Sequence, residues 1–150
     1  MDYPHFFING AWREPESDRR IAVESPATCE MVGSCPEAVE ADVNAAVSAA
    51  SAALGRDDWA GTSGADRADY IDALSDAMKS RAMDLANCAA AEIGAPISFS
   101  KGQVAMARMT LKFYAQLARG FAFEERRKGY FGDVIVRKEP IGVVAAIVPF

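Results

Sequence analysis

The apolar run Gly142–Val148 constrains the fold of this 150-residue chain more than any other stretch. It consists of small and β-branched residues between Pro140 and Pro149, and it is too short for a globular helix. Such a run predicts a β-strand buried on both faces, as in the parallel sheets of α/β proteins. Ligands of these proteins collect at the carboxyl ends of the strands, and the sequence ends at that point. We therefore expect residues 1–150 to lack a complete active site.

The composition argues against several classes of function. The net charge of −5 at pH 7 is unfavourable for binding nucleic acid or an anionic membrane surface. No apolar run approaches the roughly 20 residues of a membrane-spanning helix, and the N-terminus does not resemble a signal peptide. The three cysteines form no CxxC pair and have no histidine nearby, so neither a disulfide framework nor zinc binding is predicted. These features favour a cytoplasmic, reducing location.

Short β-strands are predicted at the start of the chain. Apolar residues flank Asn9-Gly10, which is the strongest short signal for a β-hairpin. The stretches Ile21–Val23 and Met31–Cys35 indicate two further strands around a turn at Ser25–Thr28. We therefore expect small antiparallel strands before the first helix.

Apolar residues at helical spacing predict three helices in the middle of the chain. The first spans Glu40–Leu54, with acidic residues gathered at its N-terminal end. The second and longest spans Ala65–Ile93 and ends at Gly94. The third spans Ile97–Phe121. Its predicted inner face carries five apolar residues: Val104, Met109, Phe113, Leu117 and Phe121.

A half-exposed strand is predicted after the helices. The charged stretch Glu124–Gly129 predicts a connector. In Asp133–Lys138 the side chains alternate, with Val134 and Val136 on one side and Ile135 on the other. Pro140 separates this strand from the final apolar run because proline lacks the backbone donor of a sheet.

The residues themselves provide no complete catalytic constellation. The chain contains no GxGxxG, P-loop or HExxH motif. A small core residue is favoured over a reactive nucleophile for Cys88. His5 is the only histidine, so any Ser-His-Asp or Cys-His arrangement would depend on it. Met106, Met109 and Phe113 are spaced like core residues rather than like a cofactor motif.

Several separated stretches resemble the N-terminal part of the aldehyde dehydrogenase superfamily. In chain order they are FINGAW at Phe7–Trp12, SPATCEMVGSCPEA at Ser25–Ala38, DVNAAVSAASAAL at Asp42–Leu54, EIGAP at Glu92–Pro96 and EPIGVVAAIVPF at Glu139–Phe150. Trp59, Arg67 and the pair Phe113-Tyr114 lie between them at similar intervals. Each stretch is short, and their common order across nearly the whole chain carries the resemblance.

The resemblance implies an α/β fold and a division into three segments. Residues 1–125 would form the N-terminal part of the dinucleotide-binding domain, 126–138 a strand of the oligomerisation sheet, and 139–150 the return into the first buried strand of the dinucleotide-binding domain. The chain would then contain short β-strands, two long helices plus one shorter helix, a pairing strand and the first strand of the cofactor-domain sheet. The rest of the enzyme would lie outside residues 1–150.

The resemblance also implies candidate site residues. Three positions match residues that line the dinucleotide site in the family: Val148, Pro149 and Phe150. Three residues of the third predicted helix are candidates for lining the substrate tunnel: Met106, Met109 and Phe113. Some members bind a monovalent cation through groups that match three positions here: Val23, Glu24 and Glu92. No other metal is expected.

Two departures from the family pattern affect these expectations. Family members usually have Trp at the position of Phe150, followed by the Asn whose side chain stabilises the oxyanion. Cys29 stands where the family commonly has Gly, so we expect an accessible thiol in that turn.

The implied activity is oxidation of an aldehyde to a carboxylic acid through a cysteine thioester, with hydride transfer to NAD or NADP. None of the three cysteines matches the nucleophile, so we expect the catalytic Cys, Glu and Asn beyond residue 150. The chain alone is then expected to be inactive and to bind no cofactor. The expected partners are an aldehyde and further subunits of a dimer or tetramer, with no nucleic acid and no membrane.

Two alternatives share the same pattern. The chain could be a non-catalytic oligomerisation or assembly module, or part of a CoA-acylating aldehyde dehydrogenase. The downstream catalytic loop would separate the two enzymes. A free-standing module has little reason to end on an apolar strand that neighbours must bury from both faces, and this favours the enzyme.

Overall fold

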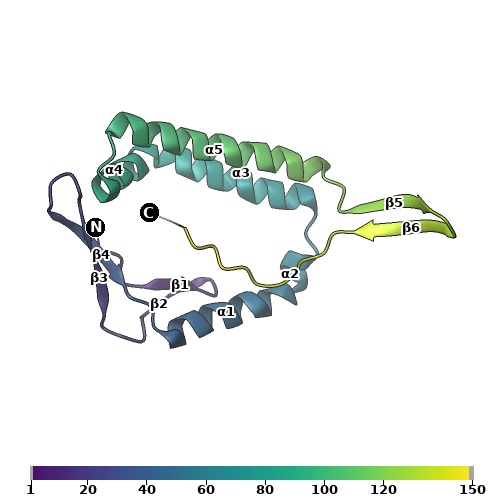
Figure 1. The fold of residues 1–150 in the computed structure, drawn as a ribbon, viewed down its shortest axis with the longest axis horizontal. Coiled ribbons are helices and arrows are strands. Elements are labelled where there is room, and N and C mark those ends of the chain that lie inside the picture. Colours follow the sequence, from purple (N-terminus) through teal and green to yellow (C-terminus); the bar gives the residue numbers. More distant parts are fainter. Residues whose placement is uncertain (1, 149–150) are drawn as a thin grey trace.

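A computed structural model describes residues 2–148, apart from the side chain at position 57. Three helices form one layer: α3 (Gly64–Ser80), α4 (Ala82–Ile93) and α5 (Ile97–Gly120). The opposite layer contains α1 (Glu40–Leu54), α2 (Asp57–Ala60) and the strands β1 (Phe6–Ile8) and β2 (Ala11–Arg13). The strands β3 (Arg20–Glu24) and β4 (Met31–Pro36) run between the two layers at one end. Strands β5 (Glu124–Gly129) and β6 (Gly132–Arg137) project from one end, and the segment after β6 returns between the layers (Figure 1).

The described strands form three separate two-stranded antiparallel sheets. The predicted hairpin at Asn9-Gly10 is confirmed, with Phe7 opposite Trp12. Both turn residues have positive φ, 55° at Asn9 and 76° at Gly10, as two-residue hairpin loops require. The predicted strands around Ser25–Thr28 are confirmed as β3 and β4, whose register shifts between Val23 and Glu24.

Helix α1 has the predicted bounds, because a local cap fixes its start. The carboxylate of Asp42 accepts a hydrogen bond from the Val39 backbone N–H at 3.0 Å. Its other oxygen accepts one from the Glu16 backbone N–H at 3.1 Å. Asp42 is buried, so both donors satisfy a carboxylate that has little access to water. One side chain therefore starts the helix and anchors the loop that precedes β3.

The prediction of one helix over Ala65–Ile93 is wrong, because two helices meet at Arg81. Arg81 has φ −109° and ψ 19°, outside the helical region, and it separates α3 from α4. No glycine or proline marks this break, so local sequence signals do not reveal it. At the other end, Ser63 and Asp66 form a capping box that starts α3 one residue before the predicted position.

Small residues bring α3 and α5 close together in antiparallel orientation. Ala68 and Ser75 of α3 and Ala115 of α5 are fully or almost fully buried. Ion pairs lie along the edge of this contact. They join Arg119 and Lys112 of α5 to three acidic residues of α3: Asp69, Asp72 and Asp76. The two helices are therefore held together by the close approach of their backbones and by ion pairs at the edge of the contact, rather than by large apolar side chains.

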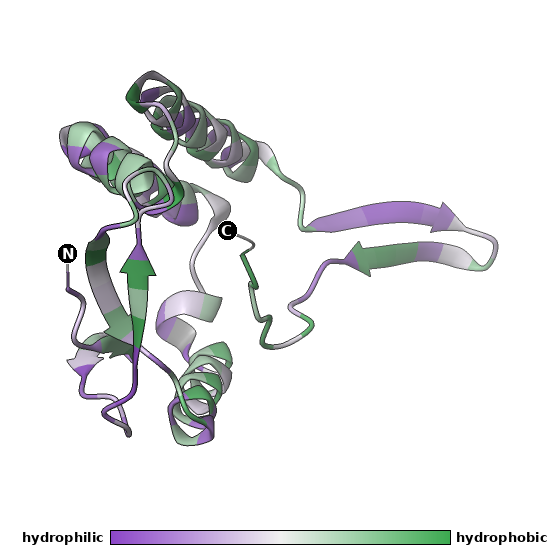
Figure 2. Ribbon diagram, turned by 60° about the vertical axis from the view of Figure 1, so that its left-hand side comes forward, coloured by the Kyte–Doolittle hydropathy of each residue, from purple (hydrophilic) through white to green (hydrophobic). Residues whose placement is uncertain are grey.

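The predicted inner face of the third helix is wrong in part. Met109 and Phe113 are 73% and 61% exposed, and Leu117 is exposed as well. Helix α5 carries two stripes on opposite faces, and the stripe of small residues packs on α3. The larger apolar stripe was the stronger hydrophobic signal, yet its side chains are exposed in the described structure. Figure 2 shows that hydrophobic and hydrophilic residues alternate along the helices of this layer.

The stretch Glu124–Gly129 is a strand rather than the predicted connector. Each of its six residues pairs with a residue of β6, from Glu124 opposite Arg137 to Gly129 opposite Gly132. Ion pairs cross the ladder between Glu124 and Arg137 at 3.0 Å and between Arg126 and Asp133 at 3.6 Å. Opposite charges on facing strands thus stabilise a hairpin that composition alone presents as a loop.

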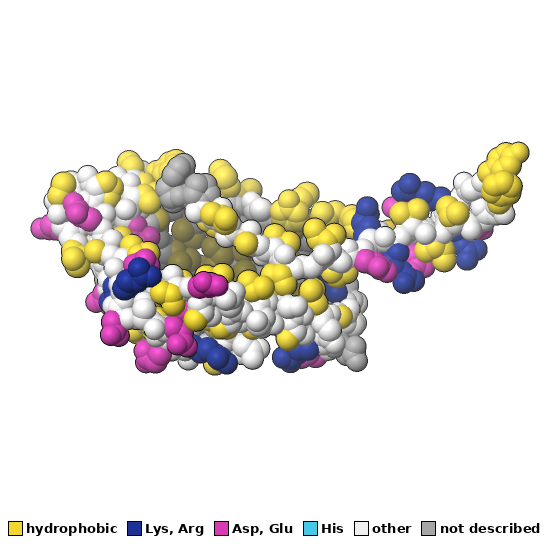
Figure 3. All heavy atoms as spheres, turned by 60° about the horizontal axis from the view of Figure 1, so that its bottom comes forward, with side chains coloured by type: hydrophobic (Ala, Val, Ile, Leu, Met, Phe, Trp, Pro, Cys, Tyr) yellow, Lys and Arg dark blue, Asp and Glu magenta, His cyan; other side chains and the backbone are white. Residues whose placement is uncertain are grey.

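The predicted buried strand at Gly142–Val148 is absent from the described structure. Residues 141–148 are assigned to no strand, and Ile141 and Ile147 are 95% and 92% exposed. A strand of this composition needs a neighbour on each side, and no described strand lies beside it. Figure 3 shows a hollowed face lined by hydrophobic side chains in this region of the molecule.

Candidate functional site

The predicted dinucleotide-site residues lie at the end of the chain. Val148 is exposed at the end of the described segment. Pro149 and Phe150 lie outside the described residues. No cofactor pocket can be built on Val148 alone, so its role stays a prediction.

The three tunnel candidates lie together on one face of α5. Met106, Met109 and Phe113 follow one another at intervals of three and four residues, and all are exposed. The Phe113 ring meets the Tyr114 ring edge-on at 5.3 Å. The structure thus assembles an apolar stripe, as a tunnel wall requires, and leaves its role a prediction.

Two of the three cation candidates share a small cavity. Val23 and Glu92 line a space of about 180 Å³ that also includes Tyr3, Ser34 and Cys35, whereas Glu24 does not line it. Within residues 2–148, no three acidic, histidine or cysteine side chains are placed to hold a metal ion. The cation role of Val23, Glu24 and Glu92 therefore stays a prediction.

The three thiols differ in environment. Burial raises the pKa of the Cys88 thiol, and its hydrogen bond to Glu92 at 3.3 Å raises it further. The thiolate of Cys88 is therefore disfavoured, which argues against a nucleophilic role. Cys29 is exposed with φ 57°, in keeping with the expected accessible thiol. Its φ lies in the left-handed region, which glycine adopts more readily than a residue with a side chain.

The carboxyl groups of Asp72 and Glu125 are poor candidates for general acids. Hydrogen bonds from Lys112 and Arg119 lower the pKa of Asp72, and the Arg127 side chain lowers that of Glu125. A general acid needs a raised pKa, because it must carry a proton near neutral pH. His5 is hydrogen-bonded to Glu14 at 2.8 Å, far from the three thiols in sequence.

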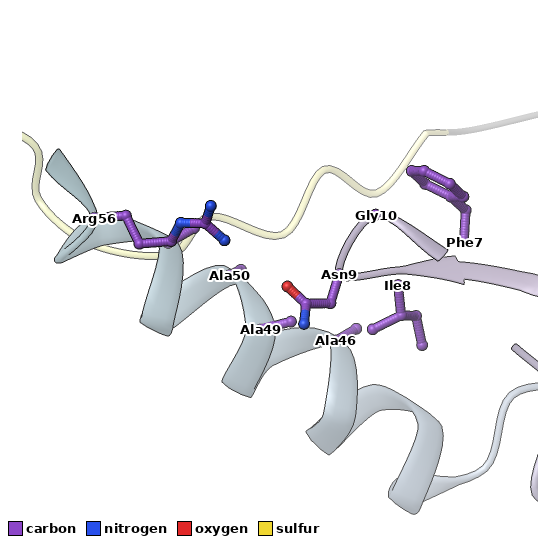
Figure 4. Close-up of a pocket in the computed structure, with 9 residues that line it drawn as sticks. Phe7, Ile8, Asn9, Gly10, Ala46, Ala49, Ala50 and Arg56 are labelled. Carbon is purple, nitrogen blue, oxygen red and sulfur yellow. The ribbon is translucent and has the colours of Figure 1, made fainter. Parts of the chain in front are cut away.

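A cavity of about 420 Å³ separates the β1–β2 turn from α1 (Figure 4). Its walls are mostly apolar: Phe7, Ile8, Gly10, Ala46, Ala49, Ala50 and Ala53. Polar groups enter only from Asn9 and Arg56, and the Arg56 guanidinium is paired with Asp58. This surface can accept apolar side chains, but it offers no nucleophile or base.

A group of side-chain contacts that sequence analysis missed lies where the projecting hairpin leaves the helices. Arg67, Phe123 and Lys138 line a cavity of about 730 Å³ together with Gly64 and Pro140. The Arg67 guanidinium lies between two aromatic rings, Trp59 and Phe123. The capping sequence Ser63-Gly64-Ala65-Asp66 was a usable signal for the start of α3, whereas the cation–ring contacts join distant positions.

The sequence model of the aldehyde dehydrogenase family matches residues 12–150. Geranial dehydrogenase of Castellaniella defragrans is 35% identical over the whole chain, which covers 32% of that protein. A chloroplastic aminoaldehyde dehydrogenase of Arabidopsis thaliana is 36% identical, again over the whole chain and 31% of its own length. The chain thus spans about a third of the length of these relatives.

Solved structures give the same match in three dimensions. A Mycobacterium tuberculosis aldehyde dehydrogenase complexed with NAD+ superposes with a TM-score of 0.88 and 35% identity, over 93% of this chain and 29% of that one. Aldehyde dehydrogenase C of Pseudomonas syringae, complexed with NAD+ and octanal, superposes with a TM-score of 0.76 and 35% identity, over 81% of this chain and 25% of that one. None of the helices in residues 2–148 is long and apolar enough to span a membrane. The predicted resemblance and fold class are confirmed: this chain belongs to the aldehyde dehydrogenase family.

Proposed function

We propose that this chain forms the N-terminal third of an NAD-dependent aldehyde dehydrogenase subunit and is the scaffold for a catalytic apparatus supplied by the remaining two-thirds. The observation that carries the proposal is the apolar segment 141–148, which lies extended and exposed between the two layers. A parallel sheet entering between the layers would bury this segment on both faces. Residues 1–125 and 139–150 would then belong to the dinucleotide-binding domain, and 126–138 to the oligomerisation sheet.

The proposed reaction is oxidation of an aldehyde through a thioester on a cysteine outside residues 1–150. NAD is favoured as the hydride acceptor because two structural neighbours are complexes with NAD+. In this assembly Val148 would approach the cofactor, and the stripe of Met106, Met109 and Phe113 would form part of the substrate tunnel. The three free thiols support a reducing location such as the cytoplasm.

A chimera tests the proposed function. Residues 1–150 replace the matching third of geranial dehydrogenase from Castellaniella defragrans, and NADH formation with geranial is measured. We expect the chimera to reduce NAD+ when the aldehyde is added, and we expect this chain alone to bind no NAD+ and form no NADH. The shortened host without the inserted residues is the control.

The assembly of the chimera must be checked before its activity is interpreted. A chimera with the subunit composition of the host, but without aldehyde-dependent NADH formation, would contradict the proposal. Saturable binding of micromolar NAD+ by the 150-residue chain alone would contradict the expectation that the cofactor site needs the remaining two-thirds.

We further propose that the β5–β6 hairpin joins subunits. Its outer strand edges are unpaired among the described residues, and such edges tend to accept another strand. Tyr130 and Phe131 at its tip are 95% and 99% exposed. Aromatic side chains this exposed are typical anchors of protein–protein contacts.

Light scattering on the isolated chain measures this association. We expect the wild type to form oligomers and the variant Ile135→Glu to shift towards monomers, because a carboxylate on the exposed face of β6 opposes burial. Val47→Glu is the matched control, since Val47 is a similarly exposed apolar residue on α1. A chain that stays monomeric over a wide concentration range, or an equal response of both variants, would exclude the hairpin as the joining element.

A further inference from the structure

The direction of the β5–β6 hairpin is decided at its stem, defined here as residues 121–124 and 137–140. The two strands contact each other along their length, and neither makes extensive contact with another helix or strand. Figure 1 shows the hairpin projecting beyond the end of α5. A hairpin that projects in this way changes its direction relative to the helices unless side chains at its base restrain it.

Arg67 provides a contact between the start of α3 and this stem. Its guanidinium carbon lies 5.6 Å from the centre of the Trp59 ring and 5.9 Å from that of Phe123. Its Nε donates a hydrogen bond to the Thr62 hydroxyl at 2.9 Å, and this hydroxyl donates to the Trp59 carbonyl at 2.7 Å. The side chain thereby connects the α2–α3 loop to the first part of the stem.

Phe123 connects the first part of the stem to the second. Its carbonyl accepts a hydrogen bond from the Lys138 backbone N–H at 2.9 Å. Its ring meets the Phe121 ring edge-on at 4.9 Å. The position of Phe123 therefore influences where the chain leaves β6 and begins its return between the layers.

The charge of Arg67 is not used in an ion pair within the described part of the chain. The described salt bridges near the stem join Arg137 to Glu124 and Glu139 instead. Arg67 is half-buried and directs its cation at two ring faces, an interaction that strengthens as water is excluded. The cavity of about 730 Å³ beside it leaves room for the stem to move if these contacts are lost.

We propose that Arg67 is a positioning residue that fixes the direction of the β5–β6 hairpin and the start of the return segment at Lys138–Pro140. It acts through Phe123, and the Thr62 hydroxyl orients its guanidinium. Its effect on assembly rests on the proposed role of the hairpin in joining subunits. Its effect on the hairpin's direction does not, so the two can be tested separately.

Pulsed electron spin resonance between labels at Lys79 and Lys128 tests the proposal in the full 150-residue chain. Introducing the labels as non-natural amino acids leaves the three cysteines unchanged. We expect a narrow distance distribution in the wild type. Arg67→Met keeps the aliphatic stem of the side chain but removes the cation, and it should broaden the distribution. Arg67→Lys should restore much of the narrow distribution, because an ammonium still binds ring faces.

Hydrogen exchange gives a second, local readout. In Arg67→Met we expect the protection of the Lys138 amide to fall by about ten-fold, equivalent to about 1.4 kcal/mol, while the amides of α4 keep theirs. Arg108→Met is the matched control: Arg108 is also half-buried, and its Nε donates to the Ser75 carbonyl at 2.9 Å, away from the stem.

Three outcomes test the positioning role of Arg67. Broadening and faster Lys138 exchange in Arg67→Met but not in Arg108→Met support the positioning role. Unchanged readouts, or equal changes in both variants, overturn it. If Arg67→Met does not fold, Thr62→Val removes the orienting hydroxyl, and a distribution as narrow as that of the wild type overturns the proposal. The labelled chain is diluted with unlabelled chain, so that distances between subunits do not enter the distribution. Failure of the positioning role is then distinct from failure of the proposed subunit contact.

Discussion

Gly64→Ala is expected to lower the free energy of unfolding by about 3 kcal/mol, or to prevent folding, because a methyl group at this position has no space. A Cβ at Gly64 would lie 2.2 Å from the Ala118 carbonyl oxygen, a distance that real Cβ contacts essentially never show. The obstructing atom belongs to the backbone of α5, so the two helices must separate to accept it. Thermal and urea unfolding followed by circular dichroism measure the effect.

Gly102→Ala is the matched control for this substitution. Gly102 lies inside α5, and a Cβ there would meet nothing within 4 Å. Alanine is a better helix former than glycine, so we expect this variant to gain about 0.5–1 kcal/mol. Equal stability of Gly64→Ala and the wild type would show that α3 and α5 are not in such close contact.

Ala115→Leu is expected to lower the free energy of unfolding by about 3 kcal/mol, because it overpacks the contact between α3 and α5. Ala115 is 1% exposed, and Ala68 in the facing helix is 0% exposed, so a leucine side chain cannot be accommodated without moving a helix. Near-ultraviolet circular dichroism should report the loss of fixed packing around the aromatic residues, and chemical unfolding gives the stability.

Ala107→Leu provides the comparison on the same helix. Ala107 is exposed, and leucine and alanine have similar helix propensity, so we expect a change within about 0.5 kcal/mol. If both leucine variants were equally stable, the small-residue contact would not limit how closely the helices approach.

The sequence is sufficient to predict features that local chemistry determines. The Asn9-Gly10 hairpin follows from a turn that needs two positive φ angles, and the start of α1 follows from acidic residues that serve as caps. The alternation of Val134, Ile135 and Val136 predicted β6 to within one residue at each end. The family resemblance joined these pieces into the correct fold class.

Features that depend on distant partners were not predictable. Arg81 breaks a helix without any glycine or proline, and the apolar stripe of α5 is larger on the exposed side than on the packed side. Arg67 contacts Trp59, which precedes α5 in the sequence, and Phe123, which follows it. The run Gly142–Val148 has the composition of a buried strand, yet composition does not supply the neighbouring strands that would bury it.

Each of the three sheets consists of two strands that follow one another in the chain, and the pairing with a distant segment among the described residues is a single bridge between Asp2 and Ser34. Local contacts of this kind form quickly, and a polypeptide emerges from the ribosome N-terminus first. We therefore expect the hairpins and the helical layer to fold while translation is still in progress. The apolar segment 141–148 then emerges beside surfaces that are already formed. Because these surfaces leave the segment exposed, it stays free to aggregate with other nascent chains until neighbouring strands bury it.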